Sequence, residues 1–204
     1  MLQDLWFLGR YHIQHHNTDG SSDNDAGWEH RRARLGFQAE MLDHLTIHAQ
    51  AVSGSDFEPV YNGFTELWVK WKFSDSLNLT VGQQKHRFTH DRNVSSRYIN
   101  YMERSMFTNM MGLDYTPAVT FSGKSGNYSY YTGIFSNATG SDMWEAFFEY
   151  DSGYSLLYAG TWDVGAYFPT DSADFTASFL HSEANANATN LNRYAEAASA
   201  ALIL

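Results

Sequence analysis

Cysteine is absent from this chain of 204 residues, and only three prolines interrupt it. The lack of cysteine excludes a disulfide-stabilised scaffold and any metal site built from thiolates. No run of about 18 consecutive apolar residues exists, so alternating strands are the way in which such a chain would cross a bilayer. Basic residues are few as well: 13 Lys and Arg against 23 Asp and Glu give a formal net charge of −10. No nucleic-acid partner is expected, because no broad basic surface would neutralise phosphates.

Aromatic residues make up 16% of the chain, and they recur in segments that alternate apolar and polar side chains. A period of two residues predicts β-strands. Ten strands are predicted, at residues 4–16, 28–41, 45–51, 65–73, 77–88, 112–122, 127–136, 143–150, 154–162 and 175–182. The last residues, 200–204, look like a strand that is cut within its length. We therefore expect a single β-barrel domain over residues 1–204, incomplete at its C-terminus.

The predicted connections alternate in length. Residues 17–27 and 53–61 form long polar loops, whereas Leu42–His44, Ser74–Ser76 and Gly123–Gly126 form short turns. Outer-membrane barrels show this alternation, with short turns at one rim and long loops at the other. The segment Thr89–Met111 has no clean alternation, and we interpret it as a long, partly helical loop that folds inward and narrows a pore.

The polar faces of these strands carry bulky charged residues. In a membrane barrel the polar face lines a water-filled lumen, whereas in a soluble sheet the apolar face is buried, and alternation alone does not distinguish the two. The charged polar face and the aromatic residues near strand ends favour the membrane barrel. A soluble ligand-binding β-sandwich is the alternative. The predicted lumenal anion contacts are Arg10, Arg32, Arg34, Lys70 and Lys72.

Three short stretches resemble the phosphate-selective porin family, the anion channels called porins O and P. They are Arg31-Arg32-Ala33-Arg34-Leu35-Gly36, Val81-Gly82-Gln83-Gln84-Lys85-His86-Arg87-Phe88 and Tyr101-Met102-Glu103-Arg104-Ser105. The resemblance covers roughly residues 5–137, and it suggests that the chain is the N-terminal part of such a porin. The alternative is a sheet that closes into a barrel by itself, since eight strands are enough.

The resemblance implies a sixteen-stranded, homotrimeric barrel in the lipid of the bacterial outer membrane. It also implies passive diffusion of small anions such as phosphate through a constriction to which Arg97, Glu103 and Arg104 contribute. Arginine suits this role because it stays charged and its planar fork matches phosphate oxygens. A weakly selective general-diffusion porin is the alternative, since lumenal cations can pair with Glu40, Glu66 and Glu103. Arg104 can equally hold the loop by an ion pair, and Lys85, His86 and Arg87 either line the mouth or lie at the membrane interface.

Eight of the nine histidines lie in the first half of the chain. Metal binding would require three or four of them to converge, and we interpret them as polar lumen and rim residues. No metal or cofactor is expected. The sequence also contains no Gly-x-Ser-x-Gly elbow, phosphate loop or His-Glu-x-x-His motif, so no enzymatic activity is predicted.

Overall fold

The computed structural model describes residues 2–17, 26–94, 105, 106, 108, 115–137, 153–169, 172–183 and 196–204. These residues form one ten-stranded antiparallel sheet, in which every strand pairs with its neighbours in sequence. The strands are β1 (Leu2–Asn17), β2 (Ala26–Met41), β3 (Leu45–Val52), β4 (Phe64–Ser74), β5 (Leu77–Lys85), β6 (Tyr115–Ser125), β7 (Tyr128–Ser136), β8 (Tyr154–Asp163), β9 (Asp174–Ser182) and β10 (Glu196–Ile203). The connections include the short helices η1 (Ser55–Phe57), α1 (His90–Asn93) and η2 (Gly165–Tyr167).

Nine of the ten predicted strands are present, so the predicted all-β antiparallel class is confirmed. The remaining predicted strand, residues 143–150, lies outside the described residues. Two boundaries were wrong: β5 ends at Lys85, where its pairing with β6 stops, and β6 continues to Ser125, so that the turn before β7 consists of Gly126 and Asn127. Gly82, Gln83 and Gln84 keep pairing with β6 although they break the simple alternation. Within the described parts of the chain, no helix is long and apolar enough to cross a membrane.

The connections sort onto two rims of the sheet. The turns between β2 and β3, β4 and β5, and β6 and β7 are short, while the connections that follow β1, β3, β5, β7 and β9 are long. The link from β8 to β9, which contains η2, is the longest on the short-turn rim. The predicted alternation of turn rim and loop rim is therefore confirmed for these connections.

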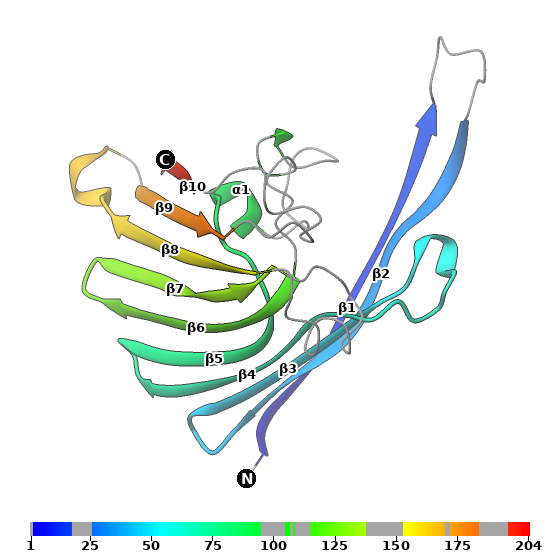
Figure 1. Ribbon diagram of the computed structural model, residues 1–204, viewed down its shortest axis with the longest axis horizontal. Helices are drawn as coiled ribbons and strands as arrows, with labels where there is room; N and C mark the ends of the chain where they lie inside the picture. Colours follow the sequence, from blue (N-terminus) through cyan, green and yellow to red (C-terminus); the bar gives the residue numbers. More distant parts are fainter. Residues whose placement is uncertain are drawn as a thin grey trace.

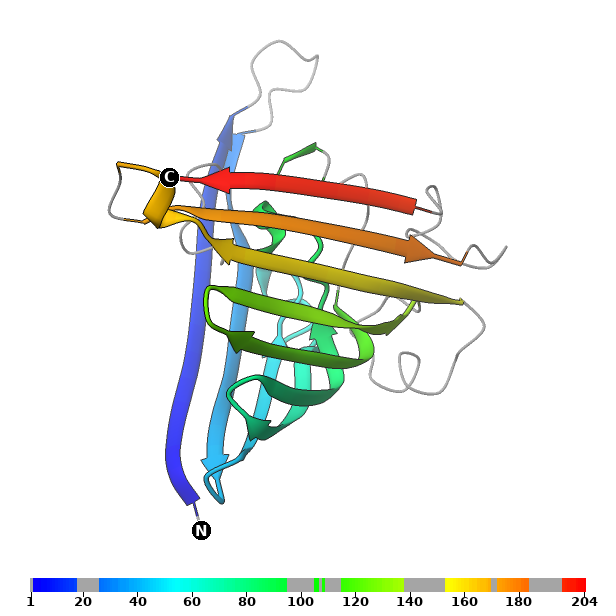
Figure 2. The same cartoon turned by 90° about the vertical axis from the view of Figure 1, so that its left-hand side faces the viewer.

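The sheet is strongly curved, and Figures 1 and 2 show β3 to β9 wrapping around a concave side that holds α1. The outer halves of β1 and β2 extend beyond the ends of β3 to β5 as a two-stranded ribbon (Figure 1). Pairing of β2 with β3 ends at Arg34 and Val52, which explains this extension. Among the described residues, β1 and β10 each have one partner strand, so the sheet is open at both edges.

The two faces of the sheet have opposite chemistry. Large apolar side chains are exposed on the convex face, with Phe7 83% and Leu35 74% accessible. The concave face instead buries polar groups, among them Thr46, His48 and Gln84. A soluble sheet shows the reverse arrangement, because water disfavours exposed apolar surface. The exposed convex residues include Leu5, Phe7, Tyr11, Ile13, Leu35, Phe37, Val69, Trp71, Val81, Val119, Phe121, Ile134, Leu156, Tyr158, Phe175, Phe179 and Leu202.

The start of the long β5–β6 connection is fixed to the concave side. Phe88 is fully buried in a small apolar cluster with Ala118, Phe135, Leu157 and Leu180, which come from β6 to β9. The main-chain oxygen of Phe88 also accepts a hydrogen bond from Ser178 of β9. This first part of the connection therefore crosses from β5 toward β9 inside the curve of the sheet, whereas most of the predicted inward loop, Thr89–Met111, lies outside the described residues.

Two further contacts hold this segment. His86 is fully buried beside Phe135, with ring centroids 3.9 Å apart, and its Nε2 lies 3.0 Å from the hydroxyl of Thr116. The hydroxyl of Thr89 caps α1 by accepting a hydrogen bond from the main-chain nitrogen of Arg92. Together these contacts place the side chains of α1 on the concave side of the sheet.

Candidate functional site

A cavity of about 980 Å³ lies on the concave face. It extends from the turn rim, where Asp75 and Lys124 contribute, to the loop rim, where Arg34 and Arg92 contribute. Its charged lining within the described residues consists of the bases Arg10, Arg34, Lys85, Arg87, Arg92 and Lys124 and the acids Glu66 and Asp75. The local charge is therefore positive although the whole chain carries −10.

Arg10 and Arg34 are the two predicted anion contacts that line this cavity. Arg32 pairs with His12 through the backbone of β2, and its side chain is outside the described residues. Arg97, Glu103 and Arg104 also lie outside the described residues. The roles predicted for these residues stay predictions.

The two predicted lysine contacts on β4 are absent from the described lining of this cavity. Lys70 leans over the ring of Trp68, with its Nζ 5.9 Å from the ring centroid. Lys72 is half exposed and forms an ion pair with Asp75 at 2.6 Å in the adjoining turn. The hydrogen bond and the charge of Lys72 lower the pKa of the Asp75 carboxyl below its usual value. Lys72 is thus directed toward a partner at the turn rim.

Arginine and tyrosine pair at the loop end of the cavity. The guanidinium of Arg34 donates a hydrogen bond to the hydroxyl of Tyr115 at 3.0 Å, and its Cζ lies 5.4 Å from the Tyr115 ring centroid. Arg92 of α1 approaches the same ring, with its Cζ at 5.3 Å. Arg87 lies 5.0 Å from the ring centroid of Tyr131 in the same manner. Both distances at Tyr115 are within the range of cation–π attraction.

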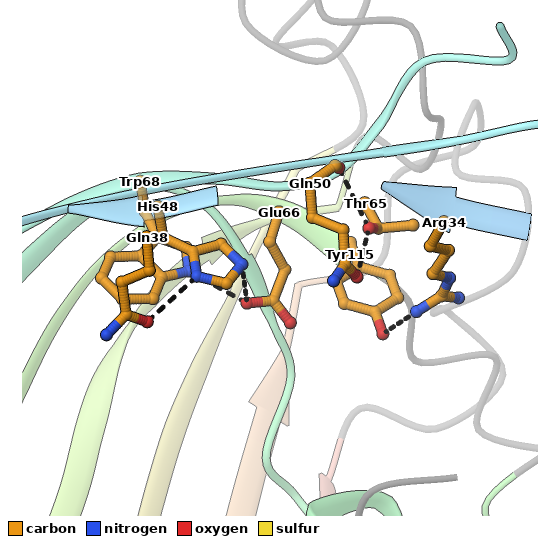
Figure 3. Close-up of polar contacts among 8 residues, drawn as sticks. All are labelled: Arg34, Gln38, His48, Gln50, Thr65, Glu66, Trp68 and Tyr115. Atoms are coloured by element: carbon orange, nitrogen blue, oxygen red, sulfur yellow. Dashed lines mark hydrogen bonds and ion pairs between the residues drawn. The ribbon is translucent and has the colours of Figure 1, made fainter. Parts of the chain in front are cut away.

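A second polar cluster lies beside the first, on β2, β3 and β4 (Figure 3). His48 stacks on Trp68 with ring centroids 4.8 Å apart and an angle of 6° between the planes. Its two ring nitrogens face Gln38 at 3.3 Å and Glu66 at 3.6 Å. The indole of Trp68 donates to the same Glu66 carboxylate at 3.0 Å. Glu66 is therefore held on the concave face by two aromatic side chains.

Sequence reasoning did not single out Arg92 or Tyr115. Arg92 lies in the predicted inward loop, so its proximity to the wall depends on how that loop folds. Tyr115 lies 81 residues from Arg34 in the chain, and no sequence pattern connects the two. Lys85 and Arg87, for which two positions were open, line the cavity. Within the described residues, no three His, Asp or Glu side chains gather as a metal site would require.

Comparisons with known proteins agree with this fold. A family model described as phosphate-selective porin O and P matches residues 7–198. A search of curated proteins gave no match. Among solved structures, the high-pH structure of OprB from Pseudomonas putida resembles this chain with a TM-score of 0.58 at 12% sequence identity. The similarity covers 88% of this chain and 51% of that one, so this chain spans about half the length of its structural relative. At this identity the likeness shows a shared fold.

Proposed function

This chain belongs to the phosphate-selective porin O and P family, and from that premise we propose that it forms part of the wall of a bacterial outer-membrane channel for small anions. Solutes would pass by diffusion along the concave face. The proposal needs three properties of the sheet: a surface that suits lipid, a polar path, and a positive local field on that path.

The exposed apolar convex face is the observation that carries the proposal. The large apolar residues on this face, Phe7 and Leu35 among them, point away from the polar concave side. In water such a surface would promote association, whereas in a bilayer it contacts hydrocarbon at no cost. A soluble β-sandwich would bury these side chains, so the arrangement favours the outer-membrane lipid as partner.

The excess of basic side chains along the cavity supports anion passage. Among the described residues, six bases and two acids line it. Selectivity follows the local field rather than the net charge, because the low-dielectric wall concentrates the field inside a pore. Many acids of the chain lie in turns and loops instead, such as Asp43, Asp56 and Glu58. The negative net charge is therefore compatible with an anion path.

We infer phosphate as the solute for which the arginines are best suited. A guanidinium presents several donors in one plane and can bind two oxygens of a phosphate at once. Arg34 lines the cavity and uses one terminal nitrogen for its hydrogen bond to Tyr115, and a guanidinium carries five N–H donors in all. By family resemblance we further propose a homotrimer, with Arg97, Glu103 and Arg104 at the constriction.

A weakly selective general-diffusion porin is the second candidate, and Glu66 is the observation that favours it. This carboxylate lines the same cavity and is fixed by His48 and Trp68. A fixed negative charge on the path would weaken the attraction for anions and admit some cations.

The reversal potential of the full-length protein in planar bilayers separates the two candidates. A potassium chloride gradient gives the ratio of chloride to potassium permeability, and added phosphate tests for block. We expect a preference for anions, block by phosphate, and a reduced preference in Arg34→Gln. In Lys72→Gln we expect a smaller change, because Lys72 is already paired with Asp75.

Each outcome has one interpretation. Equal permeability without block would leave the general-diffusion porin, and a preference for cations would contradict the anion path. Failure to conduct from a folded, vesicle-inserted protein would contradict the channel itself. If Lys72→Gln reduced the preference as much as Arg34→Gln, the assignment of the cavity lining would be wrong.

A further inference from the structure

One tyrosine connects the wall of the sheet to the inward loop. Tyr115, the first residue of β6, contacts Arg34 of β2 and Arg92 of α1 with cation-to-centroid distances that differ by only 0.1 Å, 5.4 and 5.3 Å. Its hydroxyl also accepts the hydrogen bond from Arg34. The two guanidiniums, which repel each other, therefore share one aromatic ring.

This contact exists because the sheet is curved. Three strands, β3 to β5, lie between β2 and β6 in the sheet order. At a spacing of about 4.8 Å per strand, a flat sheet would place β2 and β6 about 19 Å apart, too far for a direct contact. Figure 3 shows Arg34 and Tyr115 side by side on the concave side. The contact between Arg34 and Tyr115 therefore crosses the concave side of the sheet, where Arg92 of α1 also reaches Tyr115.

We propose that Tyr115 is a positioning residue for anion selectivity, which holds Arg34 and Arg92 together so that the two guanidiniums act on a passing anion as one site. This inference rests on the proposed anion path. Anion selectivity would then depend on the uncharged Tyr115 as well as on the basic residues.

The physical argument is preorganisation. Two free arginine side chains at a pore wall would separate, because like charges repel and long side chains gain entropy when they move. The negative face of a tyrosine ring attracts both cations, and each cation–π contact at a partly exposed site contributes about 0.5 to 1 kcal/mol. A passing anion then meets two charges that are already in place, so its binding does not have to order them.

The test uses the reversal potential of the full-length protein with three variants at this site. Tyr115→Leu removes the ring, and we expect the ratio of anion to cation permeability to fall about two- to fivefold, the effect of one cation–π contact of that size. Tyr115→Phe keeps the ring and loses the hydroxyl, so most of the ratio should remain. Arg92→Lys keeps the charge and loses the planar group, and it leaves Tyr115 in place should Tyr115→Leu fail to fold.

A double-mutant cycle distinguishes positioning from a purely structural role. If Tyr115 couples the two arginines, the effects of Arg34→Gln and Arg92→Gln on the permeability ratio are non-additive in the presence of Tyr115 and additive in Tyr115→Leu. Loss of wall stability alone would lower the unfolding midpoint without producing this coupling. Tyr158→Leu is the matched control, because Tyr158 is exposed on the convex face, and it should leave the ratio unchanged.

The outcomes separate this inference from the proposed function. A wild-type channel without anion preference would contradict the proposed function. The wild-type channel could instead prefer anions and lose that preference in Arg34→Gln, yet keep it in both Tyr115→Leu and Arg92→Lys. This result would overturn the role of Tyr115 and leave the proposed anion path standing. Additive effects of the two arginine substitutions with Tyr115 present would overturn it as well.

Discussion

At the scale of single residues, Gly82 of β5 lies at a position that has no room for a side chain. Its φ angle is +129°, and a Cβ there would lie 2.3 Å from the main-chain oxygen of Leu67 on β4. A residue with a side chain is strained at such an angle and would also push β4 away. We predict that Gly82→Ala lowers the free energy of unfolding by about 1 to 3 kcal/mol. The urea midpoint of the protein in lipid vesicles measures this loss.

Gly9→Ala on β1 is the control, because the nearest atom to its Cβ would be 4.0 Å away. Equal midpoints for the two variants would contradict the prediction.

At the scale of elements, β1 and β2 show how one hairpin presents different environments on its two sides. Leu35 points outward from β2 and is 74% exposed, whereas Leu8 of β1 lines the concave cavity. We predict that Leu35→Arg destabilises the protein in lipid vesicles by about 2 to 4 kcal/mol if it lies near the middle of the bilayer, because the bilayer does not solvate the charge. Leu8→Arg should cost less, because the cavity already accommodates arginine. Urea titration of both variants in vesicles gives the comparison, and the same cost for both would show that the convex face does not meet lipid.

At the scale of the whole molecule, a chain of net charge −10 carries a basic cavity. Attraction of anions by this cavity is electrostatic and should weaken as salt shortens the screening length, from about 30 Å at 0.01 M to about 3 Å at 1 M. We predict that the ratio of anion to cation permeability decreases as the mean salt concentration of the gradient rises. Reversal potentials measured over a series of concentrations test this, with the double variant Arg34→Gln and Arg92→Gln expected to give a flatter curve. A ratio that does not change with salt in the wild type would indicate selection by size instead of charge.

The sequence by itself determined the elements and their order. Alternation of apolar and polar residues is a local property, since neighbouring side chains on a strand must point to opposite faces. The strands around Arg34, His48 and Glu66 were therefore predictable, as were the short turns, whose residue types favour tight reversals of the chain. The three short motifs and their order pointed to the porin family that the family model matches over residues 7–198.

Only the tertiary structure decided which face lines the path and which side chains meet there. Alternation is the same whether the apolar face looks inward or outward, so the exposure of Phe7 and Leu35 had to come from the curvature of the sheet. The same curvature brings Arg34 to Tyr115, which is 81 residues away. Lys70 shares its strand parity with Glu66, yet it leans on Trp68 and is absent from the described lining of the cavity. Strand parity gives the direction of a side chain, whereas its contacts depend on long-range packing, which no local pattern encodes.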